Sequence, residues 1–235
     1  MLLKAALSRR EALGAGMFGS LVCGTFGLGV WQARRYEWKK RLIEERRESL
    51  LAAPVPLTAA TAAPFRRVTV VGEFKTDREV RVGPRSAPGS GVQGLATSPM
   101  GYDHVTACRL EDGREVLVNR GWAPNRVETT PPKGRVSLVA LVDPGEPKRR
   151  FSPQNTRDHI LWLERDFLAR VLSCEEILLV QISPSNDHFP RPRTLAHFQQ
   201  FPVDPATHLA YAATWFAISF AGAIMTRRLL RVRKK

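Results

Sequence analysis

ALGAGMFGSLVCGTFGLGVWQA, residues 12–33, contains no charged side chain and lies between Glu11 and Arg34. As a helix rising 1.5 Å per residue, such a run is about 33 Å long, enough to cross a hydrocarbon core of about 30 Å. A second charge-free window of the same length, PATHLAYAATWFAISFAGAIMT, occupies residues 205–226. Buried helices of soluble proteins seldom extend this far without an ionisable group, so the two windows predict two transmembrane helices.

The first window differs from a cleaved signal peptide, although the residues before it are basic. It exceeds the about 7–15 residues of a signal core, and its far end carries the bulky Val30-Trp31-Gln32 in place of small residues. We therefore expect an uncleaved anchor. Small residues spaced four apart give this helix a side that another helix could approach closely; they are Gly16, Ser20 and Gly24.

The net charge of +14 is concentrated beside the two predicted spans. Residues 1–11 contribute +2 and residues 227–235 contribute +6, while residues 34–206 supply the remaining +6 from 27 basic and 21 acidic residues. This distribution argues against a nucleic-acid partner and for a lipid bilayer. Short basic segments beside a span tend to stay on the inner side of the membrane, whereas a loop of this length crosses largely regardless of its charge. We expect both termini in the matrix or cytoplasm, and the large domain in the intermembrane space or periplasm.

Between the spans, residues 34–64 predict a charged juxtamembrane helix followed by a linker, and residues 65–204 predict a mainly β domain with one or two short helices. Asp112-Gly113 predicts a tight hairpin, and residues 164–173 predict a helix. Strands so outnumber helices that we expect an antiparallel barrel or a sandwich. The expected strands are 65–74, 79–82, 105–110, 114–118, 136–142 and 177–182, with loops at 84–94, 125–134 and 184–193.

Motifs for catalysis or for a multi-ligand metal site are absent from the sequence. It has no Gly-x-Ser-x-Gly elbow, phosphate-cradling loop, zinc helix or dinucleotide fingerprint, so an enzyme is not expected. Cys23 lies in the first window, and Cys108 and Cys174 stand alone, without a Cys-x-x-Cys spacing. Sequence spacing leaves open whether Cys108 and Cys174 form a disulfide.

His208 lies at the start of the second predicted span, where polar side chains tend to be functional. Tyr211 and Trp215 follow at three and seven positions and share its side of a helix. Interfacial anchoring explains this set equally well, because Tyr and Trp gather at membrane borders. The alternative is that the imidazole ligates haem iron with the aromatic rings beside the porphyrin. The remaining histidines lack metal-ligand spacing: His104, His159, His188 and His197.

Several ordered motifs make the sequence resemble the surfeit locus protein 1 family, also called the Shy-one family. The resemblance covers nearly the whole chain, with residues 183–203 the poorest match. Its motifs are Trp31-Gln32 with Arg35 and Lys39, Ala53-Pro54-Val55-Pro56-Leu57, Arg66-Arg67-Val68 to Gly72-x-Phe74, Val118-Asn119-Arg120-Gly121-Trp122-x-Pro124, Phe151-x-Pro153-x-Asn155 with Trp162 and Asp166, and His208-Leu209-x-Tyr211-x-x-Thr214-Trp215.

The resemblance implies a non-enzymatic assembly factor for cytochrome c oxidase, a haem-copper oxidase, which helps place haem a into the catalytic subunit. The implied partners are that subunit and other assembly factors. In this interpretation His208, Tyr211 and Trp215 hold haem, with His208 as the ligand of its iron, and Arg120 pairs with a propionate. The alternative for this motif is a structural role without ligand contact. Gly121 would then supply an unusual backbone angle, and Trp122 would fill the core.

Two other functions stay open at this point. The first is a scaffold that stabilises an assembly intermediate without touching haem, and the second is a membrane-anchored hydrolase. The linker favours the mitochondrial inner membrane, and a bacterial plasma membrane is the alternative.

Overall fold

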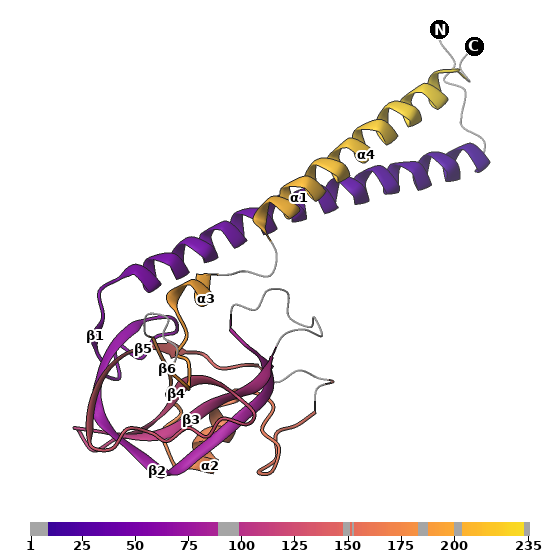
Figure 1. Cartoon of the computed structure of the whole chain (residues 1–235). Helices are drawn as coiled ribbons and strands as arrows, with labels where there is room; N and C mark the ends of the chain where they lie inside the picture. The colour runs from indigo at the N-terminus through magenta and orange to yellow at the C-terminus, as the bar shows by residue number, and fades with distance from the viewer. Residues whose placement is uncertain are drawn as a thin grey trace. The chain divides into compact units, whose positions relative to one another are not determined.

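The computed structural model describes residues 9–88, 99–147, 151, 153–182, 188–199 and 204–232. The chain divides into two compact units (Figure 1). One unit comprises Met1–Glu45 and Phe201–Lys235, and the other comprises Arg46–Gln200. The first is helical and the second is built around a β-sheet.

The first unit contains α4 (Pro205–Val232) and most of a second long helix, α1 (Arg9–Leu51). Helix α1 passes without a break from the apolar window into the charged segment, as its interleaved acids and bases predict. Helix α4 begins at a proline whose fixed φ suits the first helical turn. The preceding Asp204 caps it, since its Oδ1 accepts a 2.8 Å hydrogen bond from the backbone N–H of Ala206.

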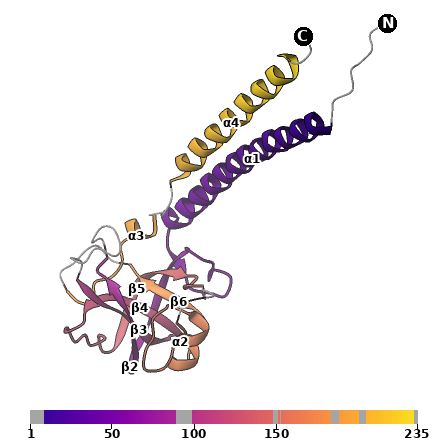
Figure 2. The same ribbon diagram turned by 90° about the vertical axis from the view of Figure 1, so that its right-hand side faces the viewer.

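Helices α1 and α4 contact each other along the apolar windows (Figure 2). Ser219 donates a 2.9 Å hydrogen bond to the Val22 carbonyl, and the rings of Phe26 and Phe216 lie 5.4 Å apart. Gly29 makes room for this packing, because a Cβ there would lie 2.7 Å from the Phe216 ring. A larger residue at position 29 would push the helices apart.

Most of the remaining helical surface is not covered by protein. Only 11% of the most apolar window in each helix is buried, whereas a core helix of a soluble protein buries most of its surface. These two helices therefore have the length, composition and exposure of membrane-spanning helices. At Gly16 and Gly24 a Cβ would meet nothing within 4 Å, so the small-residue side of α1 is not the side that contacts α4.

The second unit is a closed barrel (Figure 1). Its strands are β1 Val55–Pro56, β2 Arg67–Ser86, β3 Met100–Leu110, β4 Glu115–Pro124, β5 Arg135–Asp143 and β6 Leu178–Gln181. Around the barrel the strand order is β2-β3-β4-β6-β5, and β5 pairs again with β2. The short strand β1 runs parallel to the start of β2, inside the segment expected to be a linker.

Two apolar clusters stabilise the barrel. One gathers alternate residues of the strands, among them Val68, Phe74 and Val118, with Leu179 of β6. The other includes Leu168 and Leu172 of α2 (Arg165–Leu172) together with Leu117 of β4. Figure 2 shows α2 beside the strands. A five-residue helix, α3 (Leu195–Gln199), is the last element of this unit.

The prediction of a mainly β domain flanked by two apolar helices is confirmed, and of the two architectures left open the structure has the barrel. Two details were wrong. Strands β4 and β6 run parallel, because β6 inserts between β5 and β4 after the α2 connection. The strands expected at 65–74 and 79–82 form one strand, β2, with a register shift between Phe74 and Glu79. Its first half pairs with β5 and its second with β3, so its bend closes the barrel.

The local predictions around the hairpin and α2 agree with the structure. Strands β3 and β4 join through Asp112-Gly113, where only Gly113 has a positive φ, +88°. The predicted loop at 84–94 was wrong for its first residues, because β2 continues to Ser86 and residues 89–94 lie outside the described part. Residues 125–134 contain no strand or helix, as the predicted loop requires. The predicted loop at 184–193 is described only from residue 188, and in that part Arg191 and Arg193 each form an isolated β-bridge.

Cys108 and Cys174 are free thiols in different clusters of the barrel unit. Cys108 belongs to the cluster of alternate strand residues, and Cys174 packs against the cluster that includes Leu168 and Leu172 of α2. Burial raises the pKa of both thiols to about 11. Both therefore stay protonated near neutral pH, and no disulfide joins them.

Candidate functional site

His208 lies one turn into α4 and contacts α1 through Gln32. Its Nδ1 is 2.8 Å from the Gln32 side-chain oxygen Oε1. Because an amide oxygen only accepts hydrogen bonds, the imidazole Nδ1 carries the proton and donates it. In the neutral imidazole the other ring nitrogen, Nε2, then carries the lone pair with which histidine ligates a metal.

Tyr211 and Trp215 lie on the same helix as His208 and differ from each other in exposure. Tyr211 is 54% exposed, and Trp215 is half-buried. Ala212, between them in the sequence, is buried where α4 meets α1. All three residues of the predicted set therefore lie on α4, and Tyr211 is the more exposed of the two aromatic side chains.

A single histidine is a chemically sufficient protein ligand for a porphyrin-held iron, because the macrocycle supplies four nitrogen ligands itself. Among the described residues, no group of three or more His, Cys, Asp or Glu gathers as a bare metal site would require. The donor set around His208 thus fits haem better than a free metal ion.

Arg120 belongs to the other unit, inside the barrel. The residue is 3% exposed, and its guanidinium forms an ion pair with Glu79. Its Nε donates a 3.0 Å hydrogen bond to Thr106 Oγ1. His104 Nδ1 lies 2.8 Å from the other Glu79 oxygen. Burial alone would raise the pKa of Glu79, but the hydrogen bonds from His104 and Thr106 and the charge of Arg120 hold that pKa below its ordinary value. A propionate would have to displace this carboxylate to reach Arg120.

The residues on either side of Arg120 shape the barrel wall. Gly121 has φ +128°, and a Cβ on it would lie 2.1 Å from the carbonyl oxygen of Arg191. Asn119 Oδ1 accepts a 2.9 Å hydrogen bond from the Gly121 N–H, which fixes this turn of the backbone. Trp122 exchanges backbone hydrogen bonds with Arg191 and is 2% exposed. The structural interpretation of Gly121 and Trp122 matches this geometry.

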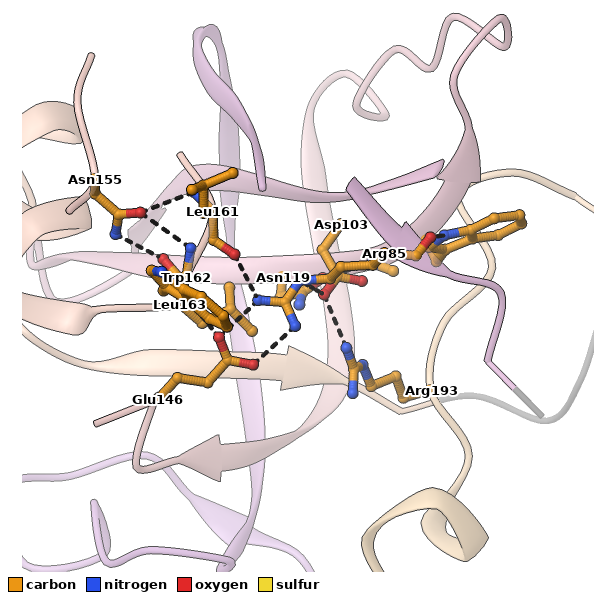
Figure 3. A network of polar contacts seen from close by, with 11 residues as sticks. Arg85, Asp103, Asn119, Glu146, Asn155, Leu161, Trp162, Leu163 and Arg193 are labelled. Carbon is orange, nitrogen blue, oxygen red and sulfur yellow. Dashed lines mark hydrogen bonds and ion pairs between the residues drawn. The ribbon is translucent and has the colours of Figure 1, made fainter. Parts of the chain in front are cut away.

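A polar network beside that contact involves residues that the sequence analysis did not single out (Figure 3). Arg85 makes two hydrogen bonds to Glu146, at 2.8 and 2.7 Å, and lies 3.4 Å from Asp103. Asp103 is fully buried and accepts a 2.8 Å hydrogen bond from Arg193. Isolated acids and arginines in sequence give no signal for such a network, since its members are far apart along the chain.

Asn155, from the Phe151-x-Pro153-x-Asn155 motif, holds a loop through three hydrogen bonds (Figure 3). Its Oδ1 accepts from the backbone N–H of Leu161 and of Trp162, and its Nδ2 donates to the Trp162 carbonyl. Glu146, which binds Arg85, also accepts from the N–H of Leu163. The Asn155 side chain is therefore explained by the structure of this loop, which adjoins the Arg85 network.

Two exposed apolar helices and a closed β-barrel, with one histidine held between the helices, define a membrane-anchored barrel protein. The chain belongs to the SURF1 family, whose model matches residues 20–220. It is 34% identical to a SURF1-like protein of Drosophila melanogaster over 96% of this chain and 80% of that protein. It is 33% identical to a SURF1-like protein of Monosiga brevicollis, over 92% and 87%, and 31% identical to human surfeit locus protein 1, over 83% and 70%.

Proposed function

We propose that this protein assists the assembly of cytochrome c oxidase by holding haem a in the membrane for the catalytic subunit. Family membership motivates the assembly role. The observation that supports haem holding is the His208–Gln32 hydrogen bond, which leaves Nε2 of the imidazole free for iron. Haem is here the cargo, and it supplies the iron to which Nε2 binds.

The protein's own side chains divide the remaining work. His208 provides the ligand atom, and the Tyr211 and Trp215 rings offer flat apolar surface beside it. Because Tyr211 is 54% exposed, the proposed haem-binding surface faces the lipid rather than a closed cavity. Cargo bound at such a surface can pass sideways to another membrane protein without a large opening of the helix pair.

Arg120 belongs to the barrel unit, whereas His208 belongs to the helical unit. Its guanidinium is already satisfied by Glu79 and Thr106 inside the barrel. The propionate contact of Arg120 stays a prediction from the sequence, and we assign this side chain to the stability of the barrel interior.

A scaffold that binds no haem is the second candidate. The side of α1 that carries Gly16 and Gly24 is open, because a Cβ on either glycine would meet nothing within 4 Å. This side is suited to close approach by a helix of a partner subunit. Absorbance separates the two candidates. The detergent-purified protein, expressed in cells that make haem a, should show a Soret band in proportion to protein if it holds haem, and no band if it is a scaffold only.

Loss of the gene should lower haem-copper oxidase activity and leave other respiratory complexes mostly intact, because the proposed cargo is specific to that oxidase. The measurement is oxidase activity and the oxidase haem spectrum in membranes of a deletion strain, with activities of the other complexes as the internal control. Normal oxidase spectra and activity in that strain would contradict the assembly role.

The proposed location is the mitochondrial inner membrane with the barrel in the intermembrane space; a bacterial plasma membrane with a periplasmic barrel is the alternative. The basic flanks of both spans predict that the two termini share the inner side. Protease added to mitoplasts or spheroplasts should remove the segment 65–203, while a tag placed after Lys235 stays intact. Digestion of that tag in sealed membranes would refute this topology.

A further inference from the structure

A hydrogen bond in the helical unit joins Gln32 of α1 to His208 of α4, which are 176 positions apart in sequence. A buried or half-buried amide facing an imidazole fixes both the orientation of the ring and the nitrogen that carries its proton. Metal-binding histidines commonly have such a partner on the nitrogen that does not face the metal. Gln32 stands in that relation to His208.

We propose that Gln32 is the positioning residue of the haem ligand: its Oε1 holds the proton on His208 Nδ1 and so presents Nε2, with its lone pair, to haem iron. This inference rests on the proposed function, since it concerns the same imidazole. It adds that the binding site is shared by two helices. Helix α4 supplies the ligand and α1 sets its protonation and its angle.

The contact occurs where the helices already touch, which gives it a fixed geometry. Phe216 against Gly29 and Ser219 on the Val22 carbonyl hold α1 and α4 together over the turns beyond Gln32 and His208. The amide is therefore held near the ring by packing that does not itself depend on the hydrogen bond. Removing the amide should change the ring's protonation without separating the helices.

The chain offers a matched control for this experiment. Ser219→Ala removes a 2.9 Å hydrogen bond between the same two helices and leaves His208 and Gln32 unchanged. A residue that acts only by joining the helices should behave like Ser219. A residue that positions the ligand should behave differently, because only its removal alters the imidazole.

The first measurement needs no haem. Ring ¹⁵N chemical shifts of His208, recorded on the apo protein in micelles and identified with His208→Ala, report which nitrogen carries the proton. Wild-type protein and Ser219→Ala should both show the proton on Nδ1. Gln32→Leu should lose that preference, and Gln32→Glu should restore it. Equal shifts in wild type and Gln32→Leu would overturn the inference and leave haem binding by His208 untouched.

The second measurement is haem affinity. Loss of a hydrogen-bond partner to a metal-binding histidine typically weakens binding about 10–100-fold, so we expect that range for Gln32→Leu and no more than about twofold for Ser219→Ala. Gln32→Glu should keep the affinity and shift the reduction potential of the bound haem to a more negative value, because a carboxylate makes the imidazole more basic. Equal weakening by Gln32→Leu and Ser219→Ala would overturn the positioning role. A wild-type protein without haem affinity would instead refute the proposed function, and this inference with it.

Discussion

His208→Ala should lose most of its bound haem while still inserting into the membrane. The substitution removes the only group on this stretch of α4 that offers a nitrogen lone pair, because the indole N–H of Trp215 is a donor only. The affinity should fall at least as far as the about 10–100-fold that follows loss of a hydrogen-bond partner to a metal-binding histidine. Haem content per protein after purification in detergent measures the effect.

His197→Ala is the matched control for that experiment. His197 lies on α3 in the barrel unit, where its Nδ1 accepts a 3.0 Å hydrogen bond from the backbone N–H of Thr194. Its removal should leave the haem content near that of the wild type. If both variants retained haem equally, His208 would be an interfacial side chain only, as the anchoring interpretation holds, and another residue would bind the iron.

Gly121→Ala should destabilise the barrel more than Gly113→Ala, the corresponding exchange in the β3–β4 turn. A Cβ at this position would lie 2.1 Å from the carbonyl oxygen of Arg191, so backbone must move, and φ +128° is unfavourable for any residue with a side chain. The conformational strain and the overpacking together cost about 3 kcal/mol. For a unit of this size that lowers the melting temperature by roughly 6–12 °C. Circular dichroism of the full chain in detergent measures the shift.

Gly113→Ala separates the two causes. Gly113 also has a positive φ, +88°, but a Cβ there would meet nothing within 4 Å. Only the conformational cost of about 1 kcal/mol should apply, with a shift of roughly 2–4 °C. Equal shifts for the two variants would mean that the approach of Arg191 to Gly121 contributes nothing, and that the Val118-to-Pro124 motif is not explained by this packing.

The candidate site was predicted from sequence only in part. His208, Tyr211 and Trp215 were proposed because a helix of known phase places positions three and seven apart on one side. Gln32 belongs to the Trp31-Gln32 motif but had no predicted role in the site, since nothing in the sequence places it beside His208. Arg120 was predicted to meet a propionate because arginine pairs readily with carboxylates, and the structure shows that a carboxylate of the protein, Glu79, already occupies it.

The sequence by itself determined the features that depend on short-range patterns. The two charge-free windows predicted the apolar helices, and the Asp112-Gly113 pair predicted the hairpin. The spacing of Phe167, Leu168 and Val171 predicted α2. Each of these features depends only on neighbouring residues and on a fixed helical or strand period. The tertiary structure alone decided the parallel β4–β6 pairing, the approach of Arg191 to Gly121, the Asp103–Arg193 ion pair and the Gln32–His208 hydrogen bond. These contacts join residues far apart in the chain, and their formation depends on how whole elements pack, which no local pattern encodes.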